Sequence, residues 1–384
     1  MARRRRSKIG FQSGEEPVSE EPVIIGEGVV PPWGTASEDP PETSSNGGEE
    51  PDEDILSIFG QPDTDDTSSD TDNSQFPDDA YFEEPQLKDH LASVNIDERT
   101  GNYLISVGLP GSGKTVLQSF TTYSMSVAGN LSAKPDITEE NGEINHRAQQ
   151  LRTLWLDEWK VGRLPKGTPL REDEIREIRL DITNLENKSQ RFNFSFLEIS
   201  GESFKDVVPT AISAPTLFQR INSFLTNDKI RLNLAFVLKT DEQLGEPTND
   251  ALFTNFIEFV EAQLKLDLTQ KVGLILVLPN PKVVFGEEEW RMMRSNKSKD
   301  RNFYKKRVKD YVYKNFPATY TIFDRWNVNK RAITIFHIGD EVQGHIERVD
   351  FKDARSFIDL NYHFFTGKRL QPKNSFWKRI FGIK

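Results

Sequence analysis

An eight-residue run rich in glycine is the part of this sequence best suited to chemistry. Residues 108–115 read G-L-P-G-S-G-K-T, which matches the pattern G-x-x-x-x-G-K-[ST]. In such a loop the small residues turn backbone N–H groups onto phosphate oxygens, the lysine reaches the β and γ phosphates, and the hydroxyl binds Mg²⁺. We therefore expect a nucleotide's phosphates to contact Gly108, Leu109, Pro110, Gly111, Ser112, Gly113, Lys114, Thr115 and Val116, with Lys114 also serving catalysis and Thr115 holding the metal.

The flanking residues predict the elements that such a loop needs. The stretch NYLISV from Asn102 is apolar and β-branched and predicts a strand that ends at the loop. From Lys114 onward the apolar residues recur at helical spacing, and so does a second run that carries Leu151, Leu154 and Trp155 and breaks at Gly162. The order strand, loop, helix gives the phosphates the positive end of a helix.

The rest of the chain predicts a three-layer α/β fold. The strand-like runs 174–185 and 191–202 are joined by only five polar residues, so they form an antiparallel hairpin. Further strands at 231–241, 271–279 and 331–340 alternate with helical patterns, which indicates a mostly parallel sheet with one antiparallel hairpin strand. We expect a P-loop domain with insertions at residues 91–366, between an acidic tail at 1–90 and a basic-aromatic tail at 367–384.

Charge divides the chain sharply. The net charge is −11, yet residues 13–85 contain 22 acidic and no basic residues, whereas residues 86–384 hold 44 basic against 38 acidic residues. The acidic stretch is too poor in large apolar side chains to offset its chain entropy, so we expect disorder there.

The chain has no cysteine, which excludes disulfides, thiolate metal sites and thiol nucleophiles. Its apolar runs are too short to span a bilayer, and we expect a cytoplasmic protein with an option of peripheral membrane contact.

A second element, together with the loop, resembles a known family. Glu198 ends a strand and is followed by Gly201 and Glu202. This acidic-x-x-G segment resembles that of Ras-like GTPases of the translation-factor-related superclass. More narrowly, GESF at 201–204 and GRLPKGT at 162–168 look like bacterial double-GTPase domains of conflict systems.

The resemblance implies roles for residues outside the phosphate loop. It implies that Thr168 completes Mg²⁺ coordination, that Glu198 is a further metal carboxylate, that the N–H of Gly201 senses the γ-phosphate, and that Glu202 holds the position of a water-orienting glutamine. Thr168 and Glu202 would thus be catalytic together with Lys114. Arg163 and Lys166 precede Thr168 and fit either a phosphate contact or a solvated loop charge.

The same comparison identifies three departures. Glu198 replaces the usual Asp, Glu202 replaces Gln, and PNPKVVF from Pro279 stands where the guanine-reading N-K-x-D is expected. We therefore expect a Mg²⁺-dependent nucleotide switch that hydrolyses GTP slowly, with GTP favoured by resemblance and ATP left open. The alternatives are a nucleotide-stabilised scaffold that does not hydrolyse and an ATP-specific P-loop enzyme.

Candidate partner segments lie outside the loop. Residues 290–314 hold ten basic residues against two acidic ones with aromatics interleaved, which fits either an anion-binding helix or a surface helix that solvates its charges. No nucleic-acid motif accompanies them, so nucleic acid is not favoured as a partner. We expect unidentified protein partners to bind the acidic tail, where EPVIIGEGVVPPWG at 21–34 and EDILSIFG at 53–60 form apolar islands, or the C-terminal helix, where membrane contact is the alternative.

Overall fold

The computed structural model describes most of the chain from residue 96 onward. The described residues are 23–25, 96–127, 129–136, 146–165, 175–204, 215–240, 249–295, 301–342 and 345–370. By its contacts the chain divides into two units, one made of Met1–Trp33 with Asp89–Lys384 and the other of Gly34–Lys88. All described residues belong to the first unit.

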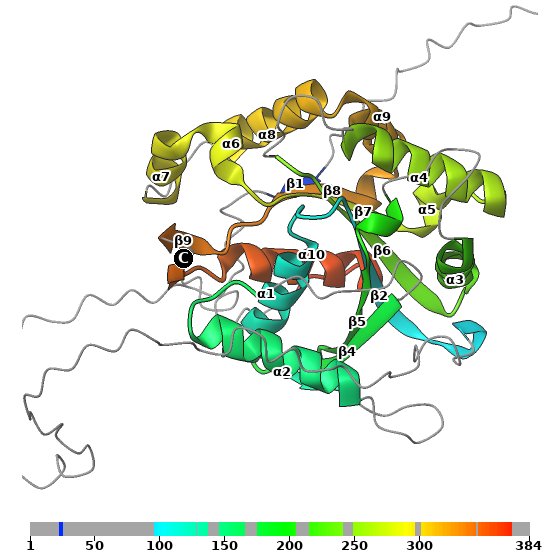
Figure 1. Cartoon of the computed structure of the whole chain (residues 1–384), viewed down its shortest axis with the longest axis horizontal. Coiled ribbons are helices and arrows are strands. Elements are labelled where there is room, and N and C mark those ends of the chain that lie inside the picture. The colour runs from blue at the N-terminus through cyan, green and yellow to red at the C-terminus, as the bar shows by residue number, and fades with distance from the viewer. Residues whose placement is uncertain are drawn as a thin grey trace, which may run out of the picture. The chain divides into compact units, whose positions relative to one another are not determined.

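An eight-stranded sheet forms the centre of this unit (Figure 1). Among the described strands of this sheet, β4 runs antiparallel to both of its neighbours, and every other pairing in the sheet is parallel. The expected mostly parallel α/β sheet is therefore confirmed. In spatial order the strands are β1 (Val23–Ile25), β8 (Arg331–Ile335), β7 (Gly273–Leu278), β6 (Ile230–Val237), β2 (Gly101–Val107), β5 (Arg191–Ile199), β4 (Ile175–Asn184) and β3 (Leu131–Pro135).

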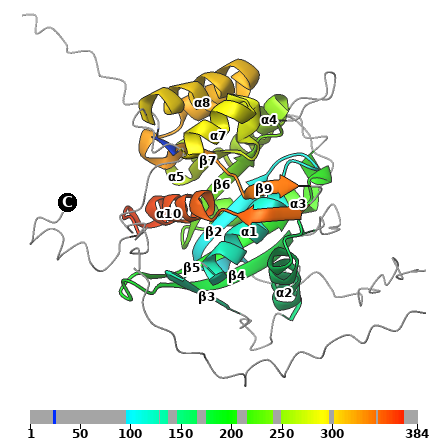
Figure 2. The ribbon, with the colours of Figure 1, turned by 90° about the vertical axis from the view of Figure 1, so that its left-hand side faces the viewer.

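Helices cover both faces of the sheet, as Figures 1 and 2 show. Along β2, Leu104 packs into one core while Tyr103 and Ile105 pack into the other, because successive side chains of a strand point to opposite faces. The first core contains α1 (Lys114–Val127), α2 (His146–Lys160) and α10 (Lys352–Thr366). The second contains α3 (Pro215–Thr226), α4 (Asn249–Leu264), α5 (Leu268–Lys271), α6 (Pro281–Phe285), α7 (Glu287–Ser295), α8 (Arg301–Asn315) and α9 (Pro317–Arg325).

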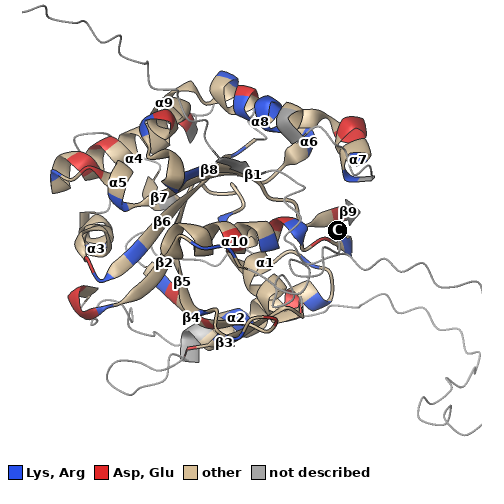
Figure 3. Cartoon of the chain, turned by 180° about the vertical axis from the view of Figure 1, so that it is seen from behind, with Lys and Arg blue, Asp and Glu red and all other residues tan. Residues whose placement is uncertain are grey.

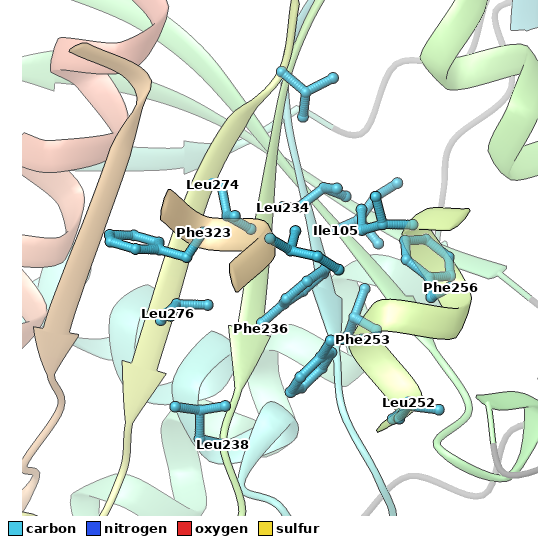
Figure 4. Close-up of a cluster of buried hydrophobic side chains, with 14 of the residues drawn as sticks. Ile105, Leu234, Phe236, Leu238, Leu252, Phe253, Phe256, Leu274, Leu276 and Phe323 are labelled. Atoms are coloured by element: carbon cyan, nitrogen blue, oxygen red, sulfur yellow. The ribbon is translucent and has the colours of Figure 1, made fainter. Parts of the chain in front are cut away.

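Aromatic packing fixes α4 against the carboxyl half of β6. The rings of Phe236 and Phe253 are stacked, with centroids 4.3 Å apart and an interplanar angle of 8° (Figure 4). Both side chains are fully buried, and burial of a phenylalanine stabilises a fold by about 1.5–3 kcal/mol. The edge of Phe256 meets Phe236 as well, at 6.2 Å. These contacts leave little freedom for the strand that runs beside β2 and its loop.

A small hairpin lies outside the main sheet. β9 (Gly339–Val342) and β10 (His345–Val349) pair antiparallel between β8 and α10. The sequence patterns did not predict these two strands. They also did not predict β3, which pairs with β4 at the far end of the sheet.

Two of the expected helices differ from their prediction. The basic stretch 290–314 is divided between α7 and α8, and Val308 and Val312 of α8 enter the core, whereas Phe303 is 50% and Tyr313 is 63% exposed. Figure 3 shows lysine and arginine along α8. In α2, Leu151 and Trp155 are buried, whereas Leu154 is 62% exposed and lies on the solvent side of the helix.

Several expectations lie outside the described residues. These are the disorder of the acidic stretch, apart from β1, and the helical character of the C-terminal residues 371–384. Three residues of the first apolar island are described, and Val23, Ile24 and Ile25 pair in parallel with Ala332, Ile333 and Thr334 of β8. None of the helices described is long and apolar enough to cross a membrane.

Candidate functional site

The glycine-rich loop joins the carboxyl end of β2 to the start of α1, as expected. Gly111 and Gly113 have φ of 74° and 94°, a left-handed conformation that favours glycine. A Cβ at Gly108 would lie 2.6 Å from Ser112 Oγ and 2.9 Å from the Val237 carbonyl oxygen. The loop shape therefore depends on glycine at three positions, and its backbone is left open to a ligand.

Lys114 stands at the first position of α1 and folds back over the loop. Its Nζ donates to the carbonyl oxygens of Gly108, at 2.8 Å, and Leu109, at 3.0 Å. The first turn of α1 contains no acidic residue, so no side-chain carboxylate in that turn offsets the positive end of the helix dipole. An ammonium and a helix N-terminus thus act together at the same loop, which is an arrangement that attracts phosphate.

Thr115 and Glu198 bring two oxygen ligands together beside the loop. The Thr115 hydroxyl donates to Glu198 Oε1 at 3.2 Å, and Glu198 is 3% exposed at the end of β5. The next turn of α1 also contacts β5, because the Gln118 side-chain amide donates to the Leu197 carbonyl at 3.3 Å. A hydroxyl and a carboxylate are hard oxygen ligands of the kind that Mg²⁺ takes from proteins, and phosphates usually supply further ligands.

Metal clusters of another kind are absent from the described part of the chain. Across the described ranges, no group of three or more His, Asp or Glu residues could hold a metal ion. Thr115 and Glu198 supply only two oxygen atoms, so a bound phosphate would have to supply further ligands if they hold Mg²⁺.

Gly201 brings the chain after β5 into contact with the loop. A Cβ at this position would lie 2.7 Å from the Pro110 nitrogen and 2.8 Å from Lys114 Nζ. Backbone atoms cannot move aside as the end of a side chain can, so only glycine allows this approach. Glu202 begins a short 3-10 helix, Glu202–Phe204, but its side chain lies outside the described part of the structure.

The segment PNPK from Pro279, which stands where the guanine-reading motif is expected, lies beside the phosphate loop. A Cβ at Gly113 would lie 3.6 Å from Cβ of Pro279, so the end of β7 does meet the phosphate loop. Asn280 caps α6 without a side-chain cap bond, and Lys282 forms an exposed ion pair with Glu287. Asp241, which ends a second lysine-x-aspartate pattern, LKTD at 238–241, lies outside the described residues.

The segment between α2 and β4, which carries Thr168, is described only at its ends. Thr168 and Lys166 lie outside the described residues. Arg163 is described, and its guanidinium pairs with Glu158 at 3.0 Å while remaining 57% exposed. Val116, the last expected contact of the loop, is half-buried and packs against the core on the side of α1.

The sequence reading missed one participant near the site. Gly162 was recognised as a helix breaker and as part of the resemblance, yet it also receives a hydrogen bond from Ile346 of β10, at 2.7 Å. The sequence holds only a weak hairpin signal, Gly344 between Val342 and Ile346.

Comparison with known proteins finds a remote structural similarity. No protein-family model matches the chain, and no curated protein does either. A search of solved structures finds similarity to a chain of the signal recognition particle receptor SRb-GTP/SRX complex from Chaetomium thermophilum. The two are 10% identical with a TM-score of 0.30, and the match covers 63% of this chain and 94% of that one. Taken by themselves, the sheet, the loop and the Thr115–Glu198 pair define a P-loop site on a mostly parallel α/β sheet.

Proposed function

We propose that this protein is a Mg²⁺-dependent nucleotide switch that binds GTP and hydrolyses it slowly. The observation that carries the proposal is the convergence of three elements on one point. Lys114 folds back over the loop, the Thr115 hydroxyl donates to Glu198, and a Cβ at Gly201 would meet both Lys114 and Pro110. A γ-phosphate bound there would contact the loop and the chain after β5 together.

The chemistry follows from the charges at this point. Lys114 would exchange its carbonyl partners for phosphate oxygens, and charged hydrogen bonds of that kind are stronger than neutral ones. Bound Mg²⁺ would neutralise charge that develops on the phosphates, held by Thr115, Glu198 and, in this proposal, Thr168. Gly201 would present its N–H to the γ-phosphate, and Glu202 would orient water.

Guanine is proposed as the base from the resemblance of residues 162–168 and 201–204 to double-GTPase domains, and a place in a conflict system is proposed on the same ground. ATP is the competing nucleotide because PNPK replaces the guanine-reading motif. Signalling would pass to protein partners through the acidic stretch or the C-terminal residues, with membrane contact as an alternative for the latter.

Nucleotide titration tests the proposal directly. Labelled GTP and ATP are titrated with Mg²⁺ into the wild type, Lys114→Ala and Lys134→Ala, the last being an exposed lysine of β3. Loss of a charged hydrogen bond costs about 1.5–3 kcal/mol, so Lys114→Ala should weaken binding about tenfold or more. Lys134→Ala should bind as the wild type does. Equal affinities in all three proteins would refute the proposal.

Glu198→Gln tests the metal side of the site. The amide oxygen can still accept from the Thr115 hydroxyl, but the negative charge is gone. We expect the gain in GTP affinity that Mg²⁺ provides to fall about tenfold, since coupling between two ligands is commonly worth about 1–3 kcal/mol. Affinity in EDTA should stay close to that of the wild type. If the GTP affinity of Glu198→Gln depends on Mg²⁺ as that of the wild type does, Glu198 does not bind the metal.

The second candidate is a nucleotide-stabilised scaffold that does not hydrolyse. It is favoured by the two glutamates, Glu198 and Glu202, at positions where the resemblance implies Asp and Gln. Phosphate release separates the two functions, because steady turnover that Lys114→Ala abolishes would exclude the scaffold. Tight binding without turnover would support it.

A further inference from the structure

One face of α8 carries lysines and aromatic rings that the core does not use. Phe303 is 50% and Tyr313 is 63% exposed, and the side chains of Lys306, Asp310 and Lys314 are exposed as well. Because residues three and four apart share a helix face, these side chains point to the same side, and the two rings lie about 15 Å apart along the helix axis. We call these five side chains the outer face of α8.

The opposite side of α8 is fixed in the core, so the helix presents its outer face in one orientation. Val312 is fully buried, and the ring of Tyr304 meets that of Phe285 at 5.9 Å. An ion pair of 2.8 Å joins Arg307 to Glu289 of α7. Figures 1 and 3 show α8 on the outer side of the helices that cover this face of the sheet, with lysine and arginine along it.

The lysines of α8 have no acidic partner within the part of the chain that the structure describes. Lys305, Lys306, Lys309 and Lys314 form no ion pair there, and the ammonium group of Lys309 instead lies 6.0 Å from the ring of Tyr320. Within α8 itself, Asp310 is the one acidic residue. The positive charge of this helix is therefore available to an anionic partner.

We propose that the outer face of α8 is a docking surface for a membrane that contains anionic lipids. An aromatic ring fits the boundary between headgroups and acyl chains, and a lysine reaches lipid phosphates with its ammonium group while its stem stays on apolar surface. Rings and lysines on one convex helix face fit a lipid surface better than a nucleic acid strand, which proteins usually hold in a positively charged groove. The inference is independent of the proposed nucleotide function.

Charge reversal tests the lysines of the outer face. The full chain is mixed with vesicles of phosphatidylcholine alone or with added phosphatidylglycerol, and bound protein is measured by flotation. The wild type should bind only the anionic vesicles. Lys306→Glu with Lys314→Glu should weaken this binding about thirtyfold or more, since each lysine near an anionic surface contributes a factor of about five.

A second double variant is the matched control for net charge. Lys134→Glu with Lys188→Glu changes the net charge equally at exposed positions of β3 and of the turn between β4 and β5. Because salt screens charges that lie far from the lipid, it should bind within about threefold of the wild type. Equal losses in the two double variants would overturn the inference.

Two single changes separate the charge of the outer face from its apolar contribution. Asp310→Lys replaces the acidic group of this face and should strengthen binding about fivefold or more. Phe303→Ser should weaken it about fivefold, because the ring would no longer enter the interface. Leu154→Ser, at a 62% exposed position of α2, should bind as the wild type does. Unchanged binding in both Asp310→Lys and Phe303→Ser would also overturn the inference.

A fluorophore reports the contact itself rather than the affinity. The chain has no cysteine, so Asp310→Cys provides a single labelling site on the outer face, and Leu154→Cys provides one on α2. The emission of an environment-sensitive fluorophore at position 310 should shift to the blue with anionic vesicles, and at position 154 it should not. Vesicle binding without a shift at position 310 would place the contact elsewhere, and binding of single-stranded RNA instead of vesicles would assign the face to nucleic acid. Either result overturns the inference and leaves the proposed nucleotide function standing, since no nucleotide is present.

Discussion

His337 illustrates how a single residue can make stability depend on pH. It follows β8 in the region where α7 and α10 meet, with the ring of Trp290 edge-on at 5.5 Å. Its backbone N–H donates to the Asp353 carboxylate at 2.9 Å. Burial, with a smaller effect from Arg294, lowers the pKa of the imidazole to about 4. The folded protein therefore holds this ring neutral at pH 7.

The expected consequence is a loss of stability in acid. Between pH 6.5 and pH 4 the unfolded chain binds a proton at His337 that the folded protein does not, so the free energy of unfolding falls as the pH drops. From pH 7 to pH 5 this residue should account for about 2 kcal/mol of the loss. Urea unfolding at the two pH values measures it, with His337→Phe as the variant that keeps a ring but cannot titrate. The same pH dependence in both proteins would contradict the assignment.

At the scale of elements, Asp250 of α4 caps another helix. Its carboxylate accepts the N–H of Ala318 at 2.9 Å and of Thr319 at 2.6 Å, in the first turn of α9. The N-cap residue of α9, Phe316, forms no side-chain cap bond of its own. A negative charge at a helix N-terminus is favourable, and here the carboxylate is nearly buried as well.

Removal of this cap should weaken the attachment of α9 to α4. Asp250→Ala leaves two N–H groups without their acceptor, and we expect a loss of about 1–3 kcal/mol in the free energy of unfolding. Asp310→Ala, at an exposed position of α8, is the matched control and should change stability by less than about 0.5 kcal/mol. Chemical denaturation followed by circular dichroism measures both. A loss at position 250 no larger than at position 310 would show that the cap contributes nothing.

Elements with strong local signals could be predicted from the sequence, and those that depend on distant partners could not. The strand before the loop, the helix from Lys114 and the antiparallel hairpin carry their own periodicity or spacing. By contrast, β3 reads LSAKP, has little alternation, and is a strand because β4 pairs with it. Helical spacing alone also does not tell which side of α2 meets the sheet, so the exposure of Leu154 could not be predicted.

The same division applies to the site. The phosphate loop could be predicted because it follows a strand in a recognisable pattern, and Glu198 and Gly201 were predicted from their resemblance to an acidic-x-x-G segment; the structure brings all three together, while their roles stay predictions. The bond between Gly162 and Ile346 joins residues far apart in the sequence, so no local pattern indicates it. The role of Thr168 stays a prediction.

For the whole molecule, the pairing of β1 with β8 is open to test. Replacing Val23, Ile24 and Ile25 with serine should weaken this parallel pair, so the amides of β8 should exchange faster. Serine at Ile55, Leu56 and Ile58, in the second apolar island, is a control of matched composition. Hydrogen exchange of residues 331–335 is the measurement. Equal exchange in both variants would mean that β1 does not protect this edge.

The place of β1 also changes the topology of the acidic stretch. Ile25 is held at the edge of the sheet, and at the other end of the interval the Ile96 carbonyl accepts from the Asn227 amide at 2.7 Å. Residues 26–95 thus connect two points of the same body and close a ring of chain, rather than forming a tail with one end attached. Closing such a ring has an entropic cost that grows only slowly with its length. A single cut within it would make the pairing of β1 bimolecular and subject to dilution, so one proteolytic event there could expose the edge of β8.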